Sequence, residues 1–96
     1  KSNSAYFRQE MSTAGFILKG KGHSIIPVLL KDAKLASVMA EKLLERGIYV
    51  IAFSFPVVAH GEARIRVQIS AAHTKEQLNF AIEAFKSIGI ELGVIK

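Results

Sequence analysis

The sequence predicts one α+β domain, a three- or four-stranded mixed or antiparallel sheet with helices on one face. A chain of 96 residues has room for a single domain. Half of its residues are apolar and its mean hydropathy is positive, which excludes a disordered chain. Segments of helical and of strand period follow one another in the order α, β, α, β, β, α. We therefore expect residues 1–96 to form one domain.

The first third of the chain is predicted to contain a helix and two strands. Phe7, Met11 and Ala14 have helical spacing within residues 4–14, and Gly15 suits a left-handed C-terminal cap. Residues 16–18 form a short predicted strand, and a loop follows over 19–22. The apolar run 25–30 predicts a second strand. Because Pro27 has no N–H to donate, this strand is expected at an edge or at a bulge.

The middle of the chain is predicted to form a helix and the strongest strand. Asp32 is the expected N-cap of a helix that runs to Arg46 and is ended by Gly47. The helix carries an apolar stripe of Leu35, Met39 and Leu43. Residues 48–55 are apolar on both faces, which predicts a central strand.

The last third is predicted to contain a turn, a strand and a helix. The turn spans 56–62, and residues 63–70 alternate with Ile65, Val67 and Ile69 on one face. Thr74 and Gln77 form a capping-box signature for a helix that Gly89 is expected to close. Its inward side chains are Leu78, Ala81, Ile82, Phe85 and Ile88. The short loop predicts that strands 48–55 and 63–70 form an antiparallel pair, whereas the helix between strands 25–30 and 48–55 permits a parallel crossover.

Composition excludes several classes of function. The chain has no cysteine, so disulfides, thiolate zinc sites and thiol nucleophiles are excluded. Its apolar runs are too short to span a bilayer, and no membrane partner is expected. The net charge of +5 makes nucleic acid a partner to consider. Because the basic residues are scattered, we expect no nucleic-acid partner. Surface charge balance, or attraction to an anionic small molecule, is the favoured explanation of the positive charge.

No complete catalytic or metal-binding constellation is visible. His23, His60 and His73 lack ligand-type spacing, so a structural or surface role is favoured for each and no metal site is expected. Gly20 and Gly22 form only a G-x-G pair, which is a weak signal for a phosphate cradle. No serine lies on a G-x-S-x-G elbow.

Two arginines are the one informative chemical feature. Arg64 and Arg66 lie with Gln68 on the outward face of a strand that its apolar face would hold rigid. Such a pair could bind an anion through planar, permanently charged guanidinium groups. The pattern alone favours an ordinary solvated strand face, and it does not say which arginine matters. A free-standing α+β module that binds an anionic small molecule through Arg64 and Arg66 is thus an alternative function.

The segments around these arginines resemble a known family. Residues 47–50, 53–58 and 61–74 read GIYV, FSFPVV and GEARIRVQISAAHT, and 88–95 read IGIELGVI. Nearly the whole chain is similar to the C-terminal region of the α-oxoamine synthases, pyridoxal phosphate (PLP) enzymes that condense an amino acid with an acyl-coenzyme A. Ala59-His60 and Phe55 depart from the family pattern, which has Pro and a basic residue, and commonly Tyr, at these positions.

The resemblance implies the small C-terminal domain of a fold-type I PLP-dependent transferase. The implied reaction is the condensation of glycine with acetyl-coenzyme A in threonine degradation, by a homodimer that is cytoplasmic, or mitochondrial in a eukaryote. Arg66 would bind the substrate carboxylate. The Schiff-base lysine and the cofactor-binding residues would lie in a large domain to which the helix over 4–14 connects. These 96 residues would then hold no catalytic residue, bind no PLP and be inactive alone.

Overall fold

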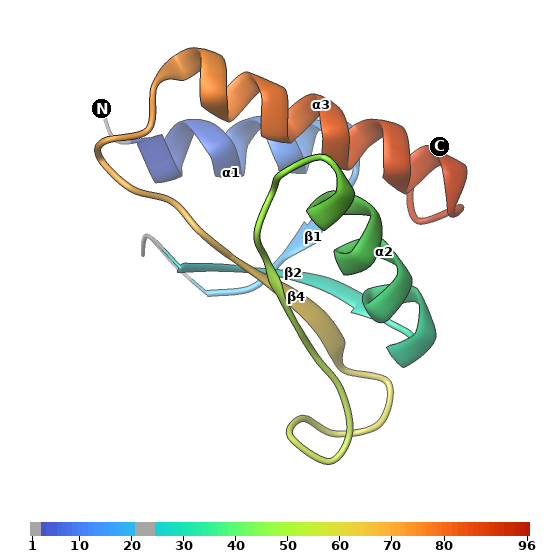
Figure 1. The fold of residues 1–96 in the computed structure, drawn as a ribbon. Helices are drawn as coiled ribbons and strands as arrows, with labels where there is room; N and C mark the ends of the chain where they lie inside the picture. Colours follow the sequence, from blue (N-terminus) through green and yellow to red (C-terminus); the bar gives the residue numbers. More distant parts are fainter. Residues whose placement is uncertain (1–2, 21–24) are drawn as a thin grey trace.

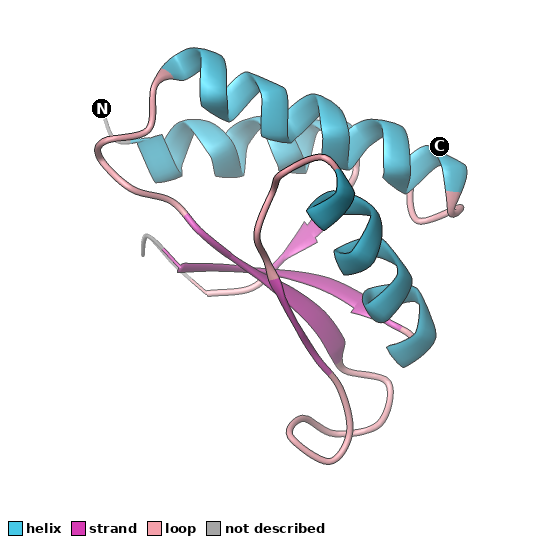
Figure 2. Ribbon diagram, in the orientation of Figure 1, coloured by secondary structure: helices cyan, strands magenta, loops and turns pink. Residues whose placement is uncertain are grey.

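The computed structural model describes residues 3–20 and 25–96. Within these residues, three helices cover one face of a four-stranded sheet (Figures 1 and 2). The helices are α1 (Asn3–Ala14), α2 (Ala33–Glu45) and α3 (Lys75–Glu91). The strands are β1 (Ile17–Leu18), β2 (Ile25–Lys31), β3 (Ile51–Phe53) and β4 (Ala63–Gln68). The predicted α+β class and the helices on one face are confirmed.

The sheet has the order β1-β2-β4-β3, and each pair of neighbours is antiparallel. The antiparallel pair predicted for residues 48–55 and 63–70 is present as β3 with β4. Strands β2 and β3 both run antiparallel to β4, so they are parallel to each other with β4 between them. The crossover through α2 therefore joins two parallel strands that do not pair, and β4 pairs with β2 from Ala63 to Gln68 and with β3 from Arg64 to Arg66.

The prediction that residues 48–55 form the central strand is wrong. Only Ile51–Phe53 are in strand conformation, and β3 lies at the edge of the sheet. The backbone N–H of Ile48 still donates to the Leu43 carbonyl at 2.9 Å, so the segment begins by closing α2. The apolar residues on both faces suggested burial on both faces, but Tyr49 and Ile51 are 81% and 54% exposed.

The expectation that Pro27 marks an edge strand or a bulge is also wrong. Strand β2 lies between β1 and β4, and the irregularity in its pairing falls between Leu29 and Lys31. The Pro27 carbonyl accepts from the Lys19 N–H at 2.9 Å, so the Pro27 nitrogen also faces β1, which has just ended. Arg8 Nη1 donates to the Lys19 carbonyl at 3.1 Å. The guanidinium thus supplies a donor where proline has none.

The helix ends follow the predicted signals with one exception. Gly15 and Gly47 have φ of 113° and 83°, as left-handed caps require. Asp32 accepts from the Leu35 N–H, and Thr74 and Gln77 form the complete capping box. The exception is Gly89, which does not close α3, because the helix continues to Glu91.

The core lies between the sheet and the helices. The predicted inward face of β4 is buried. The predicted stripes of the three helices are buried too, apart from Ala14, Leu35 and Ala81, which are half-buried. The Phe85 ring packs edge-to-face against the rings of Phe7 and Phe16, with centroids 6.0 and 5.9 Å away. Helices α1 and α3 lie side by side over this cluster (Figure 1). Among the described residues, no helix is long and apolar enough to cross a membrane.

Candidate anion-binding site on the open face of the sheet

The face of the sheet opposite the helices, here called the open face, is apolar around a basic centre. Strand alternation and cross-strand register assign to it Ile17, Ile25, Pro27, Leu29, Ile51, Phe53, Arg64, Arg66 and Gln68. Ile17, Ile25 and Ile51 are 53%, 40% and 54% exposed. Three large apolar side chains around a central cation favour a surface that meets a ligand or another part of a protein.

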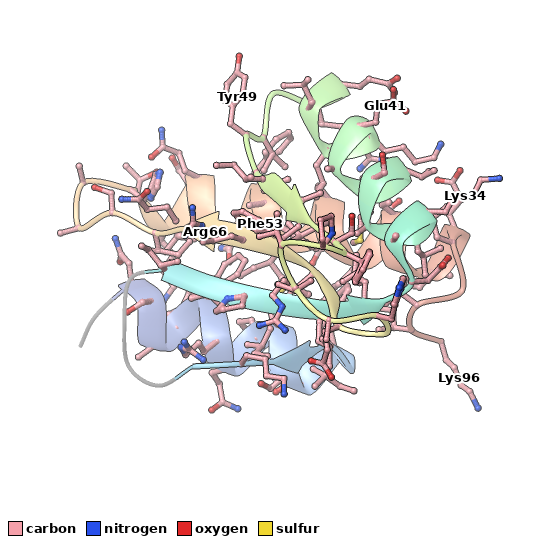
Figure 3. The ribbon with its side chains drawn as sticks, turned by 90° about the horizontal axis from the view of Figure 1, so that it is seen from below. Lys34, Glu41, Tyr49, Phe53, Arg66 and Lys96 are labelled. Atoms are coloured by element: carbon pink, nitrogen blue, oxygen red, sulfur yellow. The ribbon has the colours of Figure 1, made fainter. Side chains whose placement is uncertain are left out.

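Arg66 occupies the centre of the open face. It lies on β4 between Pro27 of β2 and Ile51 of β3. Its guanidinium carbon is 4.8 Å from the centroid of the Phe53 ring, and Figure 3 shows the two side chains next to each other, with Tyr49 pointing away. Within residues 3–20 and 25–96, no group forms a hydrogen bond or ion pair with this exposed guanidinium. Its N–H donors are therefore available to an anion.

Arg64, by contrast, has protein partners. Its Nε donates to the Glu62 carbonyl at 3.0 Å, and its Nη2 lies 3.1 Å from Glu62 Oε1. The side chain is 25% exposed. The two arginines left equivalent by the sequence pattern are thus different in the structure, because Glu62 occupies donors of Arg64 but none of Arg66.

The loop between β3 and β4 extends beyond the sheet, away from the helices (Figure 1). Within it, the rings of Phe55 and His60 stack with centroids 3.7 Å apart and an interplanar angle of 12°. The Phe55–Pro56 peptide bond is cis. Both positions at which the sequence departs from the family pattern therefore contact each other, and Phe55 and Val57 remain exposed.

A separate groove of about 670 Å³ runs between the start of α3, the end of β4 and residues 47–49. No lysine or arginine lines it, so this groove offers no lysine beside an anion cradle and does not by itself fit PLP. His73 lines the groove, and its Nδ1 accepts from the Ser70 N–H at 2.8 Å. No group of three metal-ligating side chains occurs in the part of the chain that is described. Gly22 and His23 lie outside the described residues.

Phe53 and Glu62 are site residues that the sequence pattern did not predict. Glu62 comes just before β4 and two residues before Arg64, a spacing that could have revealed the Arg64 ion pair. No comparable signal marks Phe53, because its contact with Arg66 depends on the register between β3 and β4.

Known proteins resemble this chain along most of its length. It is 55% identical over 94 residues to 2-amino-3-ketobutyrate coenzyme A ligase of Escherichia coli, covering 98% of the chain and 24% of that protein. The human mitochondrial protein of the same name is 55% identical over 83 residues, which are 86% of the chain and 20% of that protein. The chain therefore spans about a quarter of the length of the curated relatives it matches.

Solved structures share the fold. The serine palmitoyltransferase (SPT) of Sphingomonas wittichii superposes with a TM-score of 0.91 at 31% identity, covering 98% of this chain and 24% of that chain. A structure of SPT with PLP has a TM-score of 0.90 at 29% identity, covering 97% of this chain and 24% of that chain. The family model described as aminotransferase class I and II matches residues 1–85. The chain belongs to the aminotransferase class I and II family.

Proposed function

We propose that this chain is the C-terminal part of a PLP-dependent acyltransferase that condenses glycine with acetyl-coenzyme A to 2-amino-3-ketobutyrate and coenzyme A. The identity of 55% to 2-amino-3-ketobutyrate coenzyme A ligases supports the reaction class. Within that enzyme, Arg66 binds the carboxylate of glycine. The observation that carries this assignment is the guanidinium of Arg66 at the centre of the open face, whose N–H donors no described residue occupies, beside an Arg64 already paired with Glu62.

Arg66 suits this role because of its chemistry and its support. A guanidinium presents two parallel N–H donors that match the two oxygens of a carboxylate, and it stays charged at any working pH. Its backbone is held in β4 by pairing on both sides, and the alternate side chains of the strand are buried in the core. A substrate held at its carboxylate by a rigid strand has a defined orientation at its α-carbon.

The remaining parts of the active site belong, in this proposal, to the rest of the enzyme. When bound there, PLP supplies the electron sink for the carbanion of the amino acid. The open face is the side of this domain from which the substrate would be reached, since the helices cover the other. We expect a homodimer, located in the cytoplasm of a bacterium or in the mitochondrion of a eukaryote, and the name of the human relative supports the mitochondrial location.

The test is substitution of Arg66 in the intact enzyme. Each charge-assisted hydrogen bond contributes about 1.5–3 kcal/mol. Arg66→Ala should therefore lower kcat/KM for glycine by roughly tenfold to several hundredfold. Turnover should fall together with affinity, because the contact orients the α-carbon as well as binding the substrate. Arg66→Lys keeps the charge without the planar fork, so it should recover only part of the loss. Steady-state kinetics with glycine measure both effects.

Arg64→Ala is the matched control. It removes an equal side chain from the same strand, but one whose donors Glu62 already occupies, so kcat/KM for glycine should change less than about threefold. If Arg64→Ala abolishes glycine use while Arg66→Ala does not, the assignment of the residue is wrong. If neither variant affects glycine, the carboxylate site lies elsewhere.

A further inference from the structure

We propose that Phe53 is a positioning residue for Arg66, a role that rests on the proposed function of Arg66 in binding the substrate carboxylate. The guanidinium carbon of Arg66 lies 4.8 Å from the centroid of the Phe53 ring. This separation is within the range of about 6 Å over which an aromatic face attracts a cation. Phe53 is the last residue of β3 and is half-buried on the open face, whereas Arg66 is exposed.

The contact is specific to one of the two arginines. In the register of β3 with β4, Ile51 lies opposite Arg66 and Phe53 lies opposite Arg64. The ring of Phe53 therefore reaches diagonally to Arg66 rather than to its direct partner, and long side chains can bridge such a diagonal. Arg64 is held by Glu62 at the preceding end of the strand. Glu62 and Phe53 thus hold the two guanidinium groups in separate places.

An aromatic partner is chemically suited to a guanidinium that must bind a substrate. A carboxylate partner would occupy the donors that the ligand needs, as Glu62 does for Arg64. The ring attracts the cation through its π electrons and uses none of its N–H groups. A flexible arginine loses side-chain entropy when it binds, and a side chain already held in place loses less. Phe53 therefore restrains Arg66 while leaving its donors free.

The experiment uses the intact enzyme with Phe53→Leu and Phe53→Tyr, alone and combined with Arg66→Ala. Phe53→Leu should raise the Kd of glycine, measured by calorimetry, and its KM by about two- to tenfold, with a smaller effect on kcat. Phe53→Tyr keeps an aromatic face and should restore affinity to within about twofold. In the Arg66→Ala background, Phe53→Leu should have no further effect on the Kd, because the group that Phe53 positions is gone.

A matched control is Phe55→Leu, which removes an exposed aromatic ring two residues away that stacks on His60 and not on Arg66. Its glycine Kd should stay unchanged. Phe53→Ile, with a side chain that strands favour, repeats the test if Phe53→Leu fails to fold.

The outcomes separate this inference from the proposed function. If Arg66→Ala weakens glycine binding but Phe53→Leu and Phe53→Ile do not, Phe53 has no positioning role. An equal effect of Phe53→Leu with and without Arg66 would also overturn the inference, since Phe53 would then act independently of that guanidinium. If Arg66→Ala itself leaves glycine binding intact, the proposed function fails first.

Discussion

Arg64 and Arg66 have the same side chain, but their neighbours make their N–H donors differently available to a ligand. They are two positions apart on the same face of β4, yet Glu62 forms an ion pair with one and Phe53 contacts the other through its ring. The two guanidinium groups therefore differ in how many N–H donors a ligand could use, although both carry the same charge. Gly89 is a second residue whose role depends on its neighbours. It lies inside α3, and a Cβ added there would be 2.8 Å from Phe16 Cζ.

Replacing Gly89 with alanine should destabilise the protein, although alanine is the better helix former. The gain in helix propensity is about 1 kcal/mol, whereas overpacking a core costs typically 1–3 kcal/mol. We expect a net loss of about 1 kcal/mol in the free energy of unfolding, measured by urea denaturation. Phe16→Leu removes the ring atoms that the new methyl group would meet, so the double variant should lose less than the sum of the single variants. Additive losses would contradict this packing explanation.

Among the secondary-structure elements, the start of a helix and the position of a strand in the sheet have different physical causes. Helices α2 and α3 begin at the predicted N-caps, Asp32 and Thr74, because a cap needs only residues that are close in sequence. The place of a strand in the sheet depends instead on which strands pair with it. Strand β3 lies at the edge and β2 in the interior, opposite to what their apolar content and Pro27 indicate.

Removing the capping box should loosen the first turn of α3. Thr74 Oγ1 accepts from the Gln77 N–H at 3.0 Å, and Gln77 Oε1 accepts from the Thr74 N–H at 2.9 Å. Thr74→Ala removes the acceptor of the Gln77 N–H, so that only the Gln77 half of the capping box remains, and should lower the free energy of unfolding by about 1 kcal/mol. Amide hydrogen exchange at the start of α3 should become faster. Thr13→Ala removes an exposed threonine inside α1 and is the control, with an expected change within about 0.5 kcal/mol. Equal effects of the two substitutions would count against the capping role.

At the scale of the whole molecule, the two faces of the sheet are unequal. One face is covered by all three described helices, and the other carries exposed isoleucines around Arg66. The chain matches about a quarter of the length of its relatives. An apolar open face, with a cation that none of the described residues pairs with, is consistent with a domain that completes its site together with the remainder of a longer protein, as we propose above.

The 96-residue chain alone should therefore not bind PLP at one specific lysine. The described groove contains no lysine, and Lys42 and Lys86 are paired with Glu91 and Glu83. Titration with PLP, followed by borohydride reduction and mass spectrometry, should give only scattered adducts of low occupancy on surface lysines. A single stoichiometric adduct at one lysine would show that the cofactor site lies within this chain, contrary to the proposal.

The elements that depend on local chemistry can be derived from the sequence alone. The α+β class, the caps at Asp32 and Thr74, the glycine helix ends at Gly15 and Gly47, and the buried alternation of β4 all follow from periodicity and from hydrogen bonds between residues close along the chain. The same alternation places Arg64 and Arg66 together on the outward face of their strand.

Which residues meet across the sheet depends on how distant segments of the chain pack together. The edge position of β3, the interior position of β2 with Pro27, and the packing of Phe16 against Gly89 each depend on contacts between segments far apart in the sequence. The same holds for the arginines, because the diagonal contact of Phe53 with Arg66 exists only in one register of β3 on β4. A shift of that register by one residue would place Phe53 on the opposite face, and no pattern along a single strand encodes its partner.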